Sequence, residues 1–282
     1  MLFRAFKLLL GGTITTGGAA LVALYLYQNR LIYPSWAQGA RDFVDTPDKY
    51  GLPYKEHRIK TADGVEIRAF DIRQENSTMT WLVLCPNAGN IGYFLSAAEY
   101  IYRRFNASVF IYSYRGYGFS EGSPSEVGLK IDADAIMKFL QEDSFYKTQK
   151  LILYGRSLGG ANAVYIARKY SHVCDGVILE NTFLSIPKVI PHVFPWLASF
   201  SFLCHEKWRS ESDIKYTDPT LPWLFLSGEK DEIVPPQHMQ ELYRSCPSER
   251  KRISLFPQGH HNDTIIQEGY WEQIEKFLSD YV

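Results

Sequence analysis

The stretch Gly155-Arg-Ser-Leu-Gly159 constrains the fold more than any other part of the chain. It follows the apolar run 150–154 and leads into the helix-forming run that begins at Gly160, so the pattern predicts a strand, a sharp turn and a helix. A serine at the apex of such a turn has its hydroxyl exposed above the sheet, and glycines on either side let strand and helix approach closely. Ser157 is therefore predicted to be a nucleophile, the alternative being an ordinary helix N-cap serine.

A second match to the same pattern, Gly118-Phe-Ser-Glu-Gly122, competes with the first. It has no strand directly before it, because Arg115-Gly-Tyr-Gly118 separates it from the apolar run 108–113, and it continues into a loop at Pro124. The context favours Ser157 over Ser120.

A serine hydroxyl needs a base to take its proton and a third group to orient that base. In hydrolases built on such a sheet, the acid and then the histidine follow the serine, each on a loop after a strand. The apolar run 222–227 is predicted to be a buried strand, and the next loop carries three competing carboxylates, Glu229, Asp231 and Glu232.

The predicted base lies in the loop after the next strand, 251–256, where two histidines are adjacent. We expect His261 to be the base and His260 to point elsewhere. The remaining five histidines lie on predicted strands, helices or an insertion, where structural or surface roles are expected.

Hydrolysis also requires two backbone N–H groups directed at the developing oxyanion. One is expected from Leu158, directly after the nucleophile. The other is expected from the loop after the strand 80–85, where Pro86 has no N–H, so Asn87 is the first candidate and Ala88 the second. The Asn87 side chain is as well explained by a turn-forming role.

From Gly51 to its end, the chain resembles the alpha/beta-hydrolase superfamily, and more closely its membrane-anchored ABHD branch with the fungal bud-emergence-type proteins. Six stretches in the same order carry the resemblance: Asn87-Ala-Gly-Asn-Ile-Gly92, Tyr114-Arg-Gly-Tyr-Gly-Phe-Ser120, Gly155-Arg-Ser-Leu-Gly-Gly160, Glu180-Asn-Thr-Phe183, Gly228-Glu-Lys-Asp-Glu-Ile-Val-Pro-Pro236 and His261-Asn-Asp263. The resemblance implies a triad of Ser157, Asp231 and His261. The chain departs from the family pattern at Cys85-Pro86, where relatives often have His-Gly. The resemblance therefore supports the triad more strongly than it supports Asn87 as an oxyanion donor.

Length and composition fit one large catalytic domain. A chain of 282 residues with 46% hydrophobic residues can bury one core, and strands alternating with helices predict a parallel, doubly wound sheet. Together with the resemblance, this implies the alpha/beta-hydrolase fold, a mostly parallel, doubly wound sheet with helices on both faces. The domain is expected over 51–282, with a cap insertion over about 182–220.

A net charge of −1 without a basic stripe argues against a nucleic-acid partner. Four widely spaced cysteines without a C-x-x-C motif signal neither a zinc site nor a dense disulfide framework, and the expected chemistry needs no metal or cofactor.

The N-terminus predicts a membrane anchor. No charged residue lies between Lys7 and Arg30, and the apolar stretch is long enough to cross a bilayer core. We expect a tail over 1–7, a single-pass transmembrane signal-anchor helix over 8–28 and a juxtamembrane connector over 29–50. A cleaved signal peptide and a buried or amphipathic helix are the alternatives.

The side of the membrane is only weakly indicated. Arg4, Lys7 and the α-amino group on one side face Arg30 and Arg41 on the other, which slightly favours a cytosolic N-terminus and a lumenal catalytic domain. Sequons at Asn76 and Asn106 suit a lumen, and an endomembrane such as the endoplasmic reticulum or vacuole is expected. The pattern at Asn262 is expected to go unused, because a glycan there would obstruct the neighbouring base.

The insertion contains an aromatic, apolar run over 189–203 with two internal prolines. Such a run above the nucleophile would line an acyl-chain pocket. Packing of the same side chains on the sheet is an equally weighted alternative.

These features predict two-step acyl transfer through an acyl-enzyme. The resemblance to ABHD depalmitoylases implies a palmitoyl-protein thioesterase, although protein palmitates mainly face the cytosol while the topology favours the lumen. The second candidate is a lipid ester hydrolase acting on monoacylglycerol or phospholipid. A membrane-anchored scaffold that keeps the fold without turnover is the candidate from another class, and the complete triad order argues against it.

Overall fold

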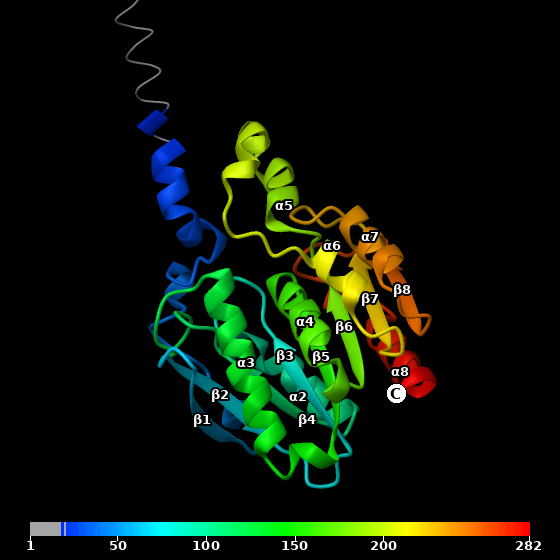
Figure 1. Cartoon of the computed structure of the whole chain (residues 1–282). Coiled ribbons are helices and arrows are strands. Elements are labelled where there is room, and N and C mark those ends of the chain that lie inside the picture. The colour runs from blue at the N-terminus through cyan, green and yellow to red at the C-terminus, as the bar shows by residue number, and fades with distance from the viewer. Residues whose placement is uncertain (1–17, 20) are drawn as a thin grey trace, which may run out of the picture.

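Eight strands form one mixed sheet in the computed structural model, which describes residues 18, 19 and 21–282 (Figure 1). Their order is β1-β2-β4-β3-β5-β6-β7-β8. The pairs β1–β2 and β2–β4 are antiparallel, and every pair from β4–β3 to β7–β8 is parallel. The strands are β1 Lys55–Lys60, β2 Glu66–Ile72, β3 Met79–Leu84, β4 Ser108–Tyr112, β5 Lys150–Arg156, β6 Gly176–Glu180, β7 Trp223–Gly228 and β8 Lys251–Phe256. The predicted alpha/beta-hydrolase fold with a mostly parallel sheet is confirmed.

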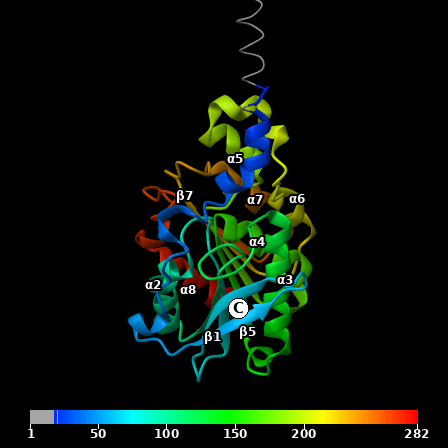
Figure 2. The same ribbon diagram turned by 90° about the vertical axis from the view of Figure 1, so that its left-hand side faces the viewer.

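Helices cover both faces of this sheet (Figure 2). The α-helices are α2 Leu95–Arg104, α3 Glu126–Glu142, α4 Leu158–Lys169, α5 Ile186–Val193, α6 Ser210–Asp213, α7 Gln237–Ser245 and α8 Tyr270–Tyr281. The 3-10 helices are η1 Ala37–Gly39, η2 Pro47–Tyr50, η3 Ile91–Phe94, η4 Tyr146–Thr148, η5 Ser171–Val173, η6 Pro195–Leu203, η7 Ile214–Tyr216 and η8 Thr264–Ile266. On one face α2 packs against α8, where the rings of Tyr100 and Trp271 stack at 4.3 Å. The opposite face carries α3 and α4.

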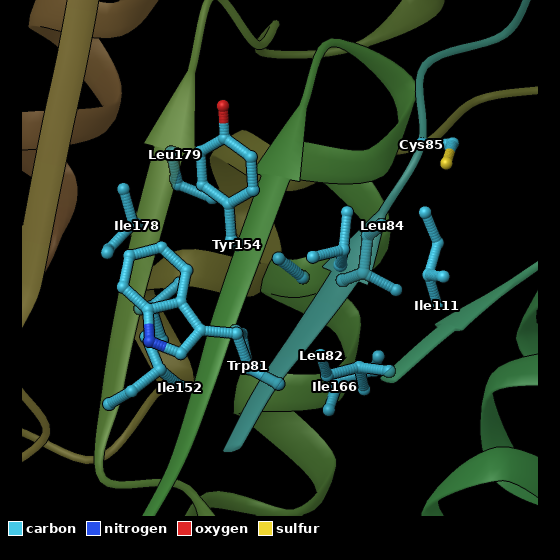
Figure 3. Packing of buried hydrophobic residues seen from close by; sticks show 14 of the residues in the cluster. Trp81, Leu82, Leu84, Cys85, Ile111, Ile152, Tyr154, Ile166, Ile178 and Leu179 are labelled. Atoms are coloured by element: carbon cyan, nitrogen blue, oxygen red, sulfur yellow. The ribbon is translucent and has the colours of Figure 1, made fainter. Parts of the chain in front are cut away.

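The central strands are buried on both sides because helices cover both faces. Every residue of β6 and β7 is buried, as expected of parallel strands made of continuous apolar runs. Trp81 on β3 packs against Tyr154 on β5, with ring centroids 5.9 Å apart (Figure 3). This core fixes the carboxyl ends of β5, β7 and β8 at one edge of the sheet, where the site loops begin.

The segment before the sheet contacts the domain rather than standing apart from it. Residues 21–32 form a helix, and the Tyr33 side chain that follows is buried. Its hydroxyl donates to the carboxylate of Glu206 and accepts a hydrogen bond from Trp208 Nε1 at 2.7 Å. The connector is thereby fixed to the chain that follows η6.

The predicted membrane span is only partly covered by the structure. Residues 8–17 and 20 of that span lie outside the described residues. Within residues 18, 19 and 21–282, the structure contains no helix whose length and apolar character would suffice for a membrane crossing.

The insertion after β6 consists of α5, η6, α6 and η7. α5 and η6 rise from the same end of the molecule as helix 21–32 (Figure 1). No residue of α5 or η6 is buried. The four cysteines, by contrast, are all buried and free: Cys85, Cys174, Cys204 and Cys246.

Candidate active site

Ser157 lies at the turn between β5 and α4 in a backbone conformation that side chains rarely adopt, with φ 53° and ψ −117°. Its N–H donates to Glu180 O at 2.9 Å, and its carbonyl accepts from Thr182 Oγ1 at 2.7 Å, which holds the strained turn. A Cβ at Gly155 or Gly159 would collide with backbone atoms, so the two glycines are required for the close crossing of strand and helix.

His261 and Asp231 complete a hydrogen-bonded chain with this serine. His261 Nε2 lies 3.2 Å from Ser157 Oγ, and His261 Nδ1 lies 2.8 Å from Asp231 Oδ2. The other carboxylate oxygen of Asp231 accepts from the N–H groups of Ile233 at 2.9 Å and Val234 at 2.7 Å. Because all three side chains are buried, at 5–6% exposure, water competes little for these bonds. The structure thus brings together the three residues predicted as a triad.

The competing residues lie elsewhere. Ser120 is fully buried, with its hydroxyl bonded to Ser113 O at 2.8 Å and Arg68 N at 2.9 Å, an arrangement that supports a turn. His260 is exposed and its Nδ1 lies 3.3 Å from Glu232 Oε2, away from the serine. Glu229 is exposed as well.

The two expected oxyanion donors border the same cavity as Ser157. The backbone N–H groups of Leu158 and Asn87 have no hydrogen-bond partner within the described part of the chain, which leaves both free to donate. The Asn87 side chain does not point toward the oxyanion: its Nδ2 donates to Ile32 O at 2.9 Å. Tyr117 fixes the same loop from the other side by donating to Asn87 O at 2.8 Å.

Two residues that the sequence analysis did not assign hold the histidine loop. Arg156 Nη2 donates to His261 O at 3.0 Å, and its Nε lies 3.8 Å from the buried carboxylate of Glu180. That carboxylate also accepts from Tyr154 at 2.6 Å and Tyr270 at 2.8 Å. Arg156 directly precedes Ser157 in the nucleophile motif, and this position was the sequence signal that could have identified it as a site residue.

Asn181 joins the acid strand to the histidine loop. Its side chain accepts from Gly228 N at 2.9 Å and donates to Thr264 Oγ1 at 2.9 Å and His261 O at 3.3 Å. Its φ of 46° lies in the left-handed region that asparagine tolerates better than most residues. The signal for Asn181 was its membership in a stretch that the resemblance includes, although its partners could not be identified from the sequence.

A cavity of about 520 Å³ opens in front of Ser157. Its walls are mostly apolar and come from three regions: helix 21–32 with Leu31 and Ile32, the insertion with Ile186, Val189, Ile190, Val193 and Phe194, and the loops with Phe183, Ile233 and Val234. The cavity is thus suited to an apolar group held beside a polar reaction centre.

The chain matches known proteins along most of its length. The family model described as serine aminopeptidase, S33, matches residues 91–220 and 214–265. A protein described as uncharacterized membrane protein YNL320W, from Saccharomyces cerevisiae, is 60% identical over 278 residues, covering 99% of this chain and 98% of that protein. Protein bem46 of Schizosaccharomyces pombe is 43% identical over 266 residues, 93% of this chain and 89% of its own length. The Pyrococcus furiosus esterase Pf2001 has the same fold, with a TM-score of 0.73, 18% identity, and coverage of 84% of this chain and 94% of its own.

Proposed function

The chain belongs to the alpha/beta hydrolases, in the branch that includes bem46. From this we propose that it is a membrane-anchored serine hydrolase that cleaves acyl esters or thioesters. One observation carries the proposal: the buried chain of hydrogen bonds from Asp231 through His261 to Ser157. A serine with this arrangement has a base within reach of its proton and a carboxylate that orients the base.

The proposed reaction has two steps. His261 Nε2 takes the proton of Ser157 as Oγ attacks the acyl carbonyl, and the imidazolium returns that proton to the departing alkoxide or thiolate. Water then attacks the acyl-enzyme with the same base and releases the acid. Asp231 keeps Nδ1 protonated and stabilises the imidazolium, while the free N–H groups of Leu158 and Asn87 stabilise the oxyanion.

The size and the apolar lining of the cavity favour a long acyl chain as the group transferred. Its volume lies within the range of roughly 300–1,000 Å³ of small-molecule sites, and its walls above the serine are apolar. A palmitoyl-protein thioesterase is the preferred activity. A lipid ester hydrolase acting on monoacylglycerol or phospholipid is the second candidate, since these substrates also present a long acyl chain.

The anchor remains a proposal that rests on the uncharged stretch over 8–28. The description of YNL320W as a membrane protein supports it. The lumenal placement rests on the sequons at Asn76 and Asn106, both exposed. A glycosidase-dependent gel shift that Asn76→Gln and Asn106→Gln together abolish is the expected result in cells, and a protein without glycans would argue for the cytosolic side.

Labelling with a fluorophosphonate probe tests the enzyme proposal. We expect the full chain to be labelled and Ser157→Ala to remain unlabelled, with Ser120→Ala as the matched control that keeps its label. A protein without label at Ser157 would instead be the non-catalytic scaffold. Release of palmitate from a palmitoyl thioester, compared with monoacylglycerol in the same vesicles, separates the two substrate classes.

A further inference from the structure

Two segments far apart in the sequence concentrate exposed apolar side chains. Ten of the twenty large hydrophobic side chains that are exposed in the described residues lie within 22–31 and 193–202. Leu26, Trp196 and Phe202 are 67%, 67% and 71% exposed. Arg30 is the only charged residue in either segment. Such a patch on a folded domain marks a surface that another protein or a membrane covers.

The two segments adjoin. A groove runs between them, with Leu21 and Leu24 of the N-terminal helix on one wall and Phe200 of η6 on the other. His205 N donates to Gln28 Oε1 at 2.8 Å, and the Tyr25 ring meets the His205 ring edge-on at 5.4 Å. Figure 2 shows the helix beside α5 and η6. The patch is therefore one surface with a fixed shape.

This groove adjoins the active-site cavity and shares part of its lining. Leu31, Ile32, Ile190 and Phe194 line both. Apolar lining therefore extends from the exposed patch toward Ser157, between the N-terminal helix and the insertion.

The preceding chain indicates what covers the patch. Residues 8–20 carry no charge and lead directly into helix 21–32. A helix rises about 1.5 Å per residue, so for a span that ends at Gln28, Leu21 lies about 10 Å inside the membrane boundary. The part of η6 that lines the groove together with Leu21 and Leu24 then lies beside this submerged part of the helix. That depth is where amphipathic segments insert and where tyrosines such as Tyr25 and Tyr27 concentrate.

The geometry points to a lipid-embedded cap: residues 189–203 insert into the interfacial layer of the bilayer that residues 8–28 cross, and the groove admits an acyl chain from that layer to Ser157. The embedding rests on the surface and on the predicted span. The route rests in addition on the proposed hydrolase function.

Depth measurement tests the embedding without reference to catalysis. The full chain with Phe202→Cys carries an NBD fluorophore and is reconstituted into phosphatidylcholine vesicles containing doxyl-labelled phosphatidylcholine. Tyr216→Cys is the matched control, because Tyr216 is 71% exposed but lies beside Arg168 at the far end of α4. The native cysteines are buried, and the unsubstituted protein gives the labelling background.

We expect doxyl lipid to quench the Phe202→Cys label several-fold more than the Tyr216→Cys label, and aqueous iodide to do the reverse. A Trp196→Cys label repeats the measurement at a second position. Equal iodide quenching at Phe202 and Tyr216 would overturn the embedding. Protection from both quenchers would also overturn it, since a protein surface would then cover the patch.

Charge in the groove tests the route. Phe200→Asp is compared with the matched Phe200→Leu for turnover of a palmitoyl thioester in vesicles and of a short, water-soluble ester. The ratio of long-chain to short-chain turnover should fall about 10-fold in Phe200→Asp, because a carboxylate in an apolar path is costly, and should stay within about twofold in Phe200→Leu. An unchanged ratio in Phe200→Asp overturns the route. Loss of Ser157-dependent turnover in the unsubstituted chain would refute the proposed function and the route with it, while lipid quenching would still support the embedding.

Discussion

Asn87 Nδ2 donates a hydrogen bond to the carbonyl oxygen of Ile32 at 2.9 Å. This bond joins the loop that carries a proposed oxyanion donor to the last turn of the N-terminal helix, whose Leu31 and Ile32 line the active-site cavity. The N-terminal helix and the loop of the proposed oxyanion donor are therefore in direct contact.

Replacing Asn87 by alanine removes this bond but keeps the backbone N–H. One hydrogen bond contributes about 0.5–1.5 kcal/mol, so we expect kcat/KM to fall about 2- to 10-fold, and more for long-chain than for short-chain esters, because the helix wall of the cavity loosens. Tyr117→Phe is the control, since it frees the same loop without touching the helix. An equal loss for both chain lengths in Asn87→Ala would contradict the expected role of Ile32.

Asp231→Asn is expected to lower kcat about 10⁴-fold while the protein stays folded. Oδ1 of Asp231 accepts from Ile233 and Val234, so an asparagine must keep its carbonyl oxygen there and turn its NH₂ toward His261 Nδ1. The imidazole then carries its proton on Nε2 and cannot accept one from Ser157. Steady-state kinetics with a soluble ester measure the loss.

Glu229→Gln, on the same loop but exposed, is the control for Asp231→Asn and should change kcat less than about twofold. A large loss at Glu229 with a small loss at Asp231 would reverse the assignment of the acid.

Asn181→Ala should destabilise the fold and lower kcat together. It leaves Gly228 N without an acceptor and removes the bond donated to Thr264 Oγ1, at a cost of about 1–3 kcal/mol in unfolding free energy, measured by urea denaturation. Asn181→Gly relieves the backbone strain at φ 46° and loses the same bonds, so a similar loss in both variants assigns the effect to the side chain. Stability restored by glycine would assign it to the backbone.

His238 provides a pH-dependent prediction. Burial, with smaller contributions from nearby Lys188 and His192, lowers the pKa of this α7 histidine to about 4, although Glu241 and Glu211 oppose the shift. Between pH 6.5 and 4 the unfolded chain binds a proton that the folded chain does not, so the stability contributed at neutral pH is lost as the pH falls. By pH 5, the free energy of unfolding is lowered by up to about 2 kcal/mol. In His238→Gln, the free energy of unfolding should depend less on pH across this window, and an unchanged slope would contradict the shifted pKa.

The sequence was most informative where short motifs follow strands. Because parallel strands end at one edge of the sheet, the loops after 150–154, 222–227 and 251–256 could be expected to meet, and the structure brings Ser157, Asp231 and His261 within hydrogen-bond reach. Choosing His261 over His260 agrees with the geometry, because adjacent loop residues point in different directions. The catalytic roles themselves remain predictions.

Long-range contacts of single side chains were not predictable. Tyr33 and Glu206 are 173 residues apart, and no local pattern pairs them. The bonds of Arg156 and Asn181 to His261 O depend on how three loops converge, which strand and helix propensities do not specify. For the apolar run 189–203, the sequence predicted two alternatives: the side chains line a pocket, or they pack on the sheet. In the structure Val189, Ile190, Val193 and Phe194 line the cavity, while Trp196 and Phe202 are exposed.

The cluster around Tyr33 has a mechanical consequence. The buried carboxylate of Glu206 accepts hydrogen bonds from the Tyr33 hydroxyl and from Glu126 N. The Glu126 carboxylate in turn accepts a hydrogen bond from Trp208 N. Detaching the N-terminal segment would remove Tyr33 and leave the buried Glu206 carboxylate short of partners. Under the proposed anchoring, this cluster holds Ser157 at one fixed distance from the lipid surface. Substrates would then be selected by how far their scissile bond stands from the membrane as well as by their chemistry.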